Sequence, residues 1–383
     1  MTDIVYVCFE DNGGMLHYAA NLAEAAGTIS PVGIAVFSEK IVERTYHSFV
    51  NVKYIRMKGF CKEGLIGRLQ KYNILYYKKK AKELIEATQP KLVHITSYSV
   101  CLYSFVRTLT RLKIKTVCTV HDPEVHDEKR TLLGKIVNIY QQKLQFLKVF
   151  QCIDAIHVHS IKHLDVLLGN FGSWIGNKTY VVQHGGGIPR TIKEGKEIPP
   201  ELNRLNYKNY CILFFGRIQP YKGLNVLEKA IHIVRKRGYK ITLILAGQGD
   251  LGTFLIDAIE DNIIINRFIA DKEVARLFEA SNVVVLPYLS ATQSGVIPLA
   301  YAYGKPVICT KVGALDELVS DGETGLVVNP NDHEALANAI IILSDKNTRQ
   351  KMGNAARKYL ESYISWQHIA AKHVDNYKKL ALL

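Results

Sequence analysis

The sequence predicts an α/β protein made of two doubly wound, parallel-sheet domains. Short apolar runs of strand length alternate with segments of helical periodicity along the whole chain. The runs are rich in valine and isoleucine and are continuously apolar, which is typical of strands buried on both faces of a parallel sheet. Residues 185–200 are rich in glycine and proline and lack periodicity, so they divide the alternation into two series.

The expected strands of the first series lie at residues 4–9, 32–37, 52–57, 92–96, 116–120, 155–159 and 180–183. Those of the second series lie at residues 211–215, 241–246, 263–265, 283–286, 307–310 and 325–328. Helical periodicity is clearest at residues 16–26, 223–236, 271–280 and 333–343. We therefore expect an N-terminal Rossmann-like domain at residues 1–186, a C-terminal one at residues 187–365, and a helix at residues 366–383 that crosses back to the first domain.

Composition favours a cytoplasmic globular protein. No run approaches the ~18 to 20 apolar residues of a membrane span. The first residues lack a basic segment before their apolar run, so they are typical of a first strand and not of a signal peptide. The seven cysteines are scattered without a Cys-x-x-Cys pair, and several fall in expected strands, which predicts reduced thiols.

The net charge of +14 is concentrated in residues 51–150, which hold 20 basic and 7 acidic side chains. Within residues 58–82, apolar side chains recur at helical spacing, namely Leu65, Leu69, Tyr72 and Tyr76. This pattern predicts a basic amphipathic helix that suits an anionic membrane surface. Its expected membrane contacts are Lys71, Lys78, Lys79 and Lys80. The alternative is a solvated lysine face whose apolar stripe packs on the core; nucleic acid is disfavoured because no binding module is present.

A strand, a small-residue loop and a helix start follow one another in residues 283–303. The loop holds Thr292, Gln293, Ser294 and Gly295, and the helix is expected to begin at Val296. Free amides and the dipole at a helix start favour an anion. An ordinary strand-to-helix turn is the alternative.

Glycines follow other expected strands in the same way. Gly13 and Gly14 open the first helix, although the loop is not a Gly-x-Gly-x-x-Gly fingerprint. The strand at 211–215 runs into Gly216, Arg217 and Lys222, and the next strand ends before Gly247. An arginine fork and a lysine point charge in one loop fit a diphosphate; a charged turn of no consequence is the alternative.

Histidines mark the strand ends of the first series. His121 and Asp122 close one strand, where they could orient a hydroxyl or move a proton, and His184 follows the last strand. His157 and His159 share a strand face, but two histidines without a nearby carboxylate or thiol do not predict a metal site.

The second series resembles the family-4 glycosyltransferases of the GT-B fold. The resemblance rests on Phe215-Gly-Arg-Ile-Gln-Pro-Tyr-Lys-Gly223, Ala246-Gly-Gln-Gly-Asp250, Leu286-Pro-Tyr288, Gly304-Lys-Pro-Val-Ile308, and Val312-Gly-Ala-Leu-Asp-Glu-Leu-Val319 with Asp321-Gly-Glu-Thr-Gly-Leu-Val327. It covers roughly residues 205–365 strongly, and the first half weakly through the Gly13-Gly14 loop and Thr119-Val-His-Asp122.

The resemblance implies two Rossmann-like domains facing a cleft, with a nucleotide-diphosphate sugar as donor substrate and no metal or other cofactor. It implies catalytic roles for His121, Arg217 and Lys222. The expected donor-binding residues are Gly13, Gly14, Gly216, Arg217, Lys222, Gly247, Thr292, Gln293, Ser294, Gly295 and Val296. The expected acceptor-binding residues are His121, Asp122 and His184.

The sequence departs from the family at its paired glutamates, which lie eight positions apart. Alignment on Gly295 places them at Thr292 and Ala300, and alignment on Gly304 places them at Ala291 and Leu299. None of the four is acidic, so the sequence resembles a Gln-Ser-Gly subgroup in which amides and neutral side chains serve the donor.

We expect a hexosyltransferase-type enzyme, acting with retention, that extends a saccharide or polyprenyl-diphosphate-linked acceptor for a bacterial surface polysaccharide. It would lie on the inner face of the cell membrane as a peripheral protein. A nucleotide-sugar epimerase of the same fold is one alternative. A catalytically silent family member that acts as a binding partner is another.

Overall fold

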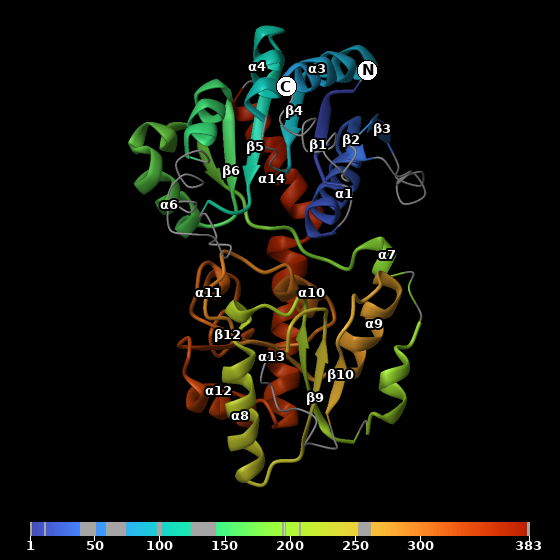
Figure 1. The fold of residues 1–383 in the computed structure, drawn as a ribbon, viewed down its shortest axis with the longest axis vertical. Coiled ribbons are helices and arrows are strands. Elements are labelled where there is room, and N and C mark those ends of the chain that lie inside the picture. The colour runs from blue at the N-terminus through green and yellow to red at the C-terminus, as the bar shows by residue number, and fades with distance from the viewer. Residues whose placement is uncertain are drawn as a thin grey trace. The chain divides into compact units, whose positions relative to one another are not determined.

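The computed structural model describes residues 2–10, 13–38, 51–58, 74–97, 102–123, 143–193, 195, 197–206, 208–251 and 262–380. The chain divides into two compact units, each of which has its own hydrophobic core (Figure 1). Unit 1 comprises Met1–Gly185 and Trp366–Leu383, and unit 2 comprises Gly186–Ser365.

Unit 1 is a parallel sheet of seven strands in the order β3-β2-β1-β4-β5-β6-β7. The strands are β1 (Ile4–Cys8), β2 (Val32–Ser38), β3 (Val52–Lys58), β4 (Leu92–Ile95), β5 (Lys115–Val120), β6 (Ala155–Val158) and β7 (Thr179–Val181). The helices are α1 (Gly13–Gly27), α3 (Ile74–Thr88), α4 (Leu102–Arg111), α6 (Ile161–Phe171), the 3-10 helix Ser173–Lys178 and α14 (Trp366–Lys379).

Helices cover both faces of this sheet because its strands are apolar on both faces. All five residues of β1 are buried. Ile4 and Tyr6 join a core with residues of α1 and α14, whereas Val5 and Val7 join a second core with residues of α3 and α4. Successive side chains of a strand point to opposite faces, so one continuously apolar run supplies both cores.

Helix α14 belongs to unit 1 although it follows unit 2 in the sequence. It packs against α1, and Figure 1 shows the two helices side by side in red and blue. Ile369, Val374 and Tyr377 of α14 are fully or almost fully buried in the core that α1 also lines.

Unit 2 is a parallel sheet of six strands in the order β10-β9-β8-β11-β12-β13. The strands are β8 (Tyr210–Phe215), β9 (Ile241–Ala246), β10 (Ile263–Ile265), β11 (Val283–Leu286), β12 (Val307–Thr310) and β13 (Gly325–Val328). The helices are α7 (Arg190–Lys193), α8 (Leu224–Lys236), α9 (Asp271–Ala280), α10 (Val296–Ala302), α11 (Leu315–Leu318), α12 (His333–Ile342), α13 (Lys346–Tyr359), the 3-10 helices Pro200–Arg204 and Pro220–Lys222, and the π-helix Leu360–Ile364.

The predicted fold class is confirmed: both units are parallel sheets between helices, and every predicted strand is present. The bounds of β9 to β13 are those expected from the sequence. Other strands differ by one or two residues at an end, as is usual where a strand passes into a turn.

The expected basic helix at residues 58–82 is only partly right. Lys58 ends β3, residues 59–73 with Lys71 lie outside the described residues, and α3 begins at Ile74. The buried side chains of α3 include Tyr77, Ala81, Leu84 and Thr88. The predicted apolar stripe ended at Tyr76, so the buried face of the helix is shifted by one residue, to Tyr77.

Lys78 and Lys79 are exposed on α3, in agreement with a surface role. Lys80 is a correction, because its side chain is 8% exposed and its ammonium donates to Glu83 at 2.6 Å. Its ammonium also lies 5.5 Å from the centre of the Tyr76 ring. The Lys80 ammonium is therefore engaged by residues of α3 itself, unlike the exposed Lys78 and Lys79.

Among the described residues, no helix is both long enough and apolar enough to span a bilayer. The cysteines among the described residues, Cys8, Cys118, Cys152, Cys211 and Cys309, are free thiols.

Candidate active site

The strand order of unit 2 reverses between β8 and β11. After β8 the chain adds β9 and β10 on one side, and β11 to β13 follow on the other. In open parallel sheets, ligands bind beyond the carboxyl ends of the strands at such a reversal. The loops that lie there are Gly216 to Gly223, after β8, and Pro287 to Gly295, after β11.

Glycines let these loops approach one another closely. Gly223 has a left-handed backbone, with φ of 69°, and a Cβ there would lie 1.9 Å from the carbonyl oxygen of Pro287. A Cβ on Gly247, after β9, would lie 2.0 Å from the carbonyl oxygen of Gly216. The amide of Leu289 donates to the carbonyl of Tyr221 at 2.7 Å. The backbone around Arg217 and Lys222 is therefore fixed by neighbours on both sides.

Lys222 lies over the face of the Tyr288 ring, with its Nζ 3.7 Å from the ring centre. Tyr288 is fully buried, and the ring attracts the ammonium through its electron-rich face. Burial lowers the pKa of Lys222 to about 8. In the described part of the chain, Lys222 has no carboxylate within ion-pair distance, so its charge lacks a counter-ion from the protein.

Arg217 is exposed on the same loop, two residues after β8. Among the described residues it makes no ion pair either. The loop thus presents two cations, one exposed and one half-buried, at the reversal of the sheet. An anion with several oxygens would give both cations partners.

The loop after β11 ends in the short helix α10. Ser294 is 8% exposed and its Oγ accepts a hydrogen bond from the Val296 amide at 3.3 Å. The Val296 amide is therefore capped within the protein, which corrects the expectation that it is free for a ligand. Gly295 adjoins open space, since a Cβ there would meet nothing within 4 Å.

Thr292 is held by the neighbouring loop. The carbonyl of Thr292 accepts a bond from the Ala314 amide at 2.9 Å, and a Cβ on Gly313 would lie 1.8 Å from the carbonyl of Ala291. Both Thr292 and Gln293 are half-buried. Ala300 is fully buried and Leu299 is 8% exposed, so neither position of a second glutamate offers a ligand a polar side chain.

In unit 1, the strand order reverses between β1 and β4. Gly13 and Gly14 are the first residues of α1, which follows β1, and residues 11–12 before them lie outside the described residues. Gly14 is exposed, and a Cβ there would meet nothing within 4 Å. The expectation that these glycines open a helix at a strand end is met; their part in binding stays a prediction.

Three histidines gather beyond the carboxyl ends of β5, β6 and β7. They are His121, His159 and His184, and the Tyr18 ring of α1 lies against each of them, with centroid distances of 4.5, 5.4 and 5.1 Å. The Trp366 ring also lies near Tyr18 and His184, with centroid distances of 5.4 and 5.7 Å. Asp122 is half-buried beside His121. The structure therefore brings His121 and His184 together, as the sequence predicts, and adds His159 and Tyr18.

Burial keeps these rings neutral. Desolvation lowers the pKa of His121 to about 3 and that of His184 to about 4, and it lowers the pKa of His159 well below its usual value. In each case the main cause is that a charged ring would lose its hydration on burial.

The neutral rings of His121 and His159 have fewer protons than hydrogen bonds. His121 Nε2 lies 2.9 Å from the Thr96 carbonyl, and His159 Nδ1 lies 3.0 Å from the Val182 carbonyl. The remaining nitrogens, His121 Nδ1 and His159 Nε2, face each other at 2.9 Å. Carbonyls only accept, so three contacts require three protons, whereas two neutral rings carry two. One of the three contacts therefore lacks a proton while both rings stay neutral.

A separate histidine group lies inside the core. His94, His157 and His373 have nitrogens within 4.8 Å of one another, a spacing that could suit a metal. His157 Nδ1 lies 2.7 Å from His373 Nδ1, and His94 Nε2 lies 2.7 Å from the Thr119 hydroxyl. His94 Nδ1 contacts the Tyr377 hydroxyl. Both ring nitrogens of His94 and one nitrogen each of His157 and His373 are already engaged in these contacts, which fits a hydrogen-bonded core.

Sequence reasoning missed three residues of the candidate site. Tyr288 was part of a quoted motif, but nothing in the sequence places it under Lys222. Tyr18 and His159 were missed as partners of His121 because they come from distant segments. The sequence spacing of His157 and His159 indicated only that they share a strand face. It did not indicate that His159 joins His121 and His184 while His157 joins His94 and His373.

Comparison with known proteins agrees with this geometry. A family model described as Glycosyltransferase Family 4 matches residues 13–185, and one described as Glycosyl transferases group 1 matches residues 209–346. D-inositol 3-phosphate glycosyltransferase of Paenarthrobacter aurescens is 35% identical over 45% of this chain and 44% of its own length. The capsular polysaccharide biosynthesis glycosyltransferase CapM of Staphylococcus aureus is 28% identical over 59% of this chain and 61% of its own.

A solved structure supports the fold over the whole chain. HepE of Anabaena, determined in complex with UDP-glucose, superposes with a TM-score of 0.71 at 16% identity, covering 99% of this chain and 100% of the other. The sequence alignments cover 44% and 61% of the lengths of these two curated relatives. Fold and site define a two-domain α/β protein with a cationic strand-end loop, the class of GT-B glycosyltransferases. The chain belongs to glycosyltransferase family 4.

Proposed function

We propose that this chain moves a sugar from a nucleotide-diphosphate donor to a saccharide or a polyprenyl-diphosphate-linked acceptor. The observation that carries the proposal is the pair Arg217 and Lys222, which no carboxylate neutralises in the described part of unit 2. Both lie where a doubly wound sheet binds its ligands. A diphosphate suits them because it stays charged at neutral pH and accepts bonds from a guanidinium fork.

The chemistry assigned to the two cations is stabilisation of the leaving group. The bond between the anomeric carbon and the diphosphate oxygen breaks, and the acceptor oxygen forms a new bond to that carbon and loses its proton. Arg217 and Lys222 would stabilise the charge that develops on the diphosphate, so we propose no cofactor beyond the donor. Retention of anomeric configuration is proposed from family membership.

Further donor contacts are proposed around this loop. Gly216 and Gly247 would let the donor approach the backbone, as would Gly13 and Gly14 in unit 1. Thr292, Gln293, Ser294 and Gly295 would meet the sugar or ribose with neutral groups, since Ala300 offers no carboxylate. The UDP-glucose complex of HepE supports a uridine nucleotide as the first donor to test.

The acceptor is assigned to His121, Asp122 and His184. Neutral imidazoles can donate or accept a hydrogen bond to a sugar hydroxyl without a charge to desolvate. Because the pKa of His121 is about 3, the ring is a weak base, so we propose that it orients the acceptor hydroxyl while the released proton passes to the departing diphosphate. The similarity to CapM supports a surface polysaccharide as the product, whether capsule, exopolysaccharide or O-antigen.

A lipid-linked acceptor would bring the protein to the inner face of the cell membrane. Lys78 and Lys79 are exposed on α3, and each cation near an anionic surface contributes about 1 kcal/mol of attraction. We propose peripheral attachment through these two lysines.

The proposal is tested by turnover. The protein is incubated with UDP-, GDP-, ADP- and dTDP-sugars, with and without vesicles that contain a polyprenyl-diphosphate-linked saccharide, and released nucleotide and extended acceptor are measured. One donor should give acceptor-dependent release. An epimerised sugar nucleotide without acceptor would identify an epimerase instead, and donor binding without any turnover would identify a silent family member.

A further inference from the structure

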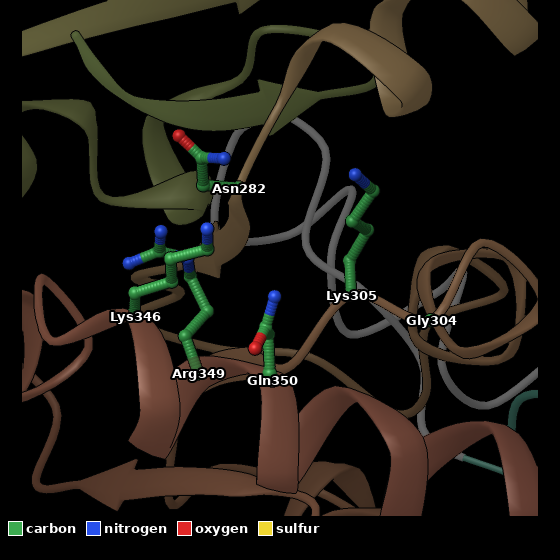
Figure 2. A pocket seen from close by; sticks show the side chains of 6 residues that line it. All are labelled: Asn282, Gly304, Lys305, Lys346, Arg349 and Gln350. Carbon is green, nitrogen blue, oxygen red and sulfur yellow. The ribbon is translucent and has the colours of Figure 1, made fainter. Parts of the chain in front are cut away.

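A cationic pocket lies in unit 2, apart from the candidate active site. Its volume is about 230 Å³, and its lining consists of Asn282, Gly304, Lys305, Lys346, Arg349 and Gln350 (Figure 2). Of the six lining residues, three have cationic side chains, two have amide side chains, one is glycine, and none is acidic. A pocket with this lining selects for an anion.

The pocket lies at the opposite edge of the sheet from the donor loops. Asn282 immediately precedes β11, and Lys305 lies two residues before β12. The donor loops follow the other ends of β8 and β11. Because β11 is four residues long, the two edges are separated by roughly 13 Å of strand. One anion cannot occupy both places.

Close backbone packing builds the pocket. Gly304 turns the chain with φ of 63° between α10 and β12. Helix α13 crosses this turn at Gly353, where a Cβ would lie 2.2 Å from the Gly304 carbonyl oxygen. Lys346, Arg349 and Gln350 are spaced i, i+3 and i+4, so they share one face of α13. Figure 2 shows these three side chains rising from the helix toward Asn282, with Lys305 on another wall.

Two of the donor groups are held in place by their other contacts. Arg349 donates through one nitrogen to the carbonyls of Leu343 and Ser344, at 2.8 and 3.0 Å. Asn282 accepts a bond from the Cys211 amide at its Oδ1, at 2.8 Å, which leaves its NH₂ group as the donor. An anion that binds here meets donors whose orientation is already fixed, so little side-chain entropy is lost on binding.

The nearest carboxylates offset the positive charge of the pocket only in part, because each is also engaged by another group. Glu279 pairs with Arg276 at 2.9 Å, and Asp345 caps the Thr348 amide at 2.7 Å. Burial lowers the pKa of Lys305, and the nearby Arg349 and Arg357 lower it further, whereas Glu279 opposes them. A bound anion would relieve this repulsion. In the described part of the chain, no protein acceptor contacts the Lys346 ammonium or the Gln350 amide.

We propose that this pocket binds a phosphate group, either as free phosphate or as the phosphomonoester of a small molecule, independently of the donor site. Phosphate fits because its several oxygens can accept from the Arg349 fork, the Lys346 ammonium and the two amides together. The pocket also lies at the start of α13, a helix of 14 residues whose dipole favours negative charge there. Asp345 already caps that helix, so the side chains supply the binding.

The experiment is calorimetric titration of the whole protein with inorganic phosphate and, separately, with glycerol 3-phosphate, in phosphate-free buffer at physiological salt. The pocket variant is Lys346→Glu/Gln350→Glu, which places two carboxylates in the pocket. Both positions are exposed, so the variant should fold. The matched control is Lys351→Glu/Asn354→Asp on the same helix, which changes the net charge equally at exposed positions outside the pocket.

The expected result is saturable binding by the wild type and the control, weakened at least tenfold in the pocket variant. Tighter binding of glycerol 3-phosphate would identify a phosphorylated metabolite as the ligand, and equal binding would identify free phosphate. Absence of saturable binding to the wild type, or equal affinity in the pocket variant and the control, would overturn the proposal. Both variants keep Arg217 and Lys222, so failure of this site and failure of the proposed donor site are distinguishable.

Discussion

Replacing Lys222 tests the diphosphate role at the residue with the most distinctive environment. Lys222→Met keeps an apolar chain over the Tyr288 ring and removes the charge. A hydrogen bond to a charged group contributes about 1.5 to 3 kcal/mol, so the nucleotide sugar that the wild type binds should bind roughly 10- to 150-fold more weakly. Calorimetric titration measures this loss directly.

The pH dependence gives the same prediction a second readout. Lys222 has a pKa lowered to about 8, so it is charged below that pH and loses its charge above it. The diphosphate of a nucleotide sugar keeps its charge over this range, and wild-type affinity should therefore fall about tenfold between pH 7 and pH 9. Lys222→Arg should bind equally at both pH values because a guanidinium stays protonated. A wild-type affinity that is independent of pH, together with unchanged binding by Lys222→Met, would refute the reasoning.

Three further predictions concern strain, acid stability and the membrane. Gly223→Ala forces a side chain into a left-handed backbone and against the Pro287 carbonyl, so it should destabilise unit 2 by about 1 to 3 kcal/mol in denaturant unfolding. His184 has a pKa lowered to about 4, below its unfolded value, so the unfolded state binds more protons and stability should fall as pH drops from about 6.5 to about 4. Lys78→Glu/Lys79→Glu should release the protein from anionic vesicles in a sedimentation assay.

Each of these has a control. Gly238→Ala shares a positive φ, of 88°, but its Cβ meets nothing within 4 Å, so it should cost less than Gly223→Ala. His184→Gln should flatten the acid limb of the stability curve, and an unchanged slope would count against a buried neutral ring. Lys236→Glu/Lys240→Glu alters two exposed lysines of unit 2 and should leave vesicle binding intact. Equal release by both lysine pairs would point to net charge instead of a docking face.

The strands were predictable because their chemistry is local. A residue buried on both faces must be apolar at every position, so each strand of a covered parallel sheet is a continuous run between turn residues. Five strands of unit 2 accordingly have the bounds expected from the sequence. The stripe of α3 was placed one position off because Tyr76 and Tyr77 are adjacent aromatics, and only packing decides which of them is buried.

Only those residues of the candidate site that follow directly from the strand order could be predicted from the sequence. Ligands bind beyond strand ends at the reversal of a sheet, which singled out Arg217 and Lys222 without any contact information. Contacts between distant segments were not accessible in this way. The position of Lys222 over the Tyr288 ring and the edge-to-face contact of Tyr18 with His121 depend on how separate strand-end loops and α1 pack. The capping of the Val296 amide by Ser294 depends on a side-chain rotamer that sequence does not reveal.

The central claim is that the loop after β8 binds the donor diphosphate, and calorimetric titration of UDP-glucose and the other nucleotide sugars into wild type and Arg217→Ala tests it most directly. The account predicts saturable binding of one nucleotide sugar by the wild type and at least a tenfold weaker affinity in Arg217→Ala, with Lys240→Ala as a control that binds normally. Wild-type protein that binds none of the nucleotide sugars, or Arg217→Ala that binds as tightly as the wild type, would contradict it.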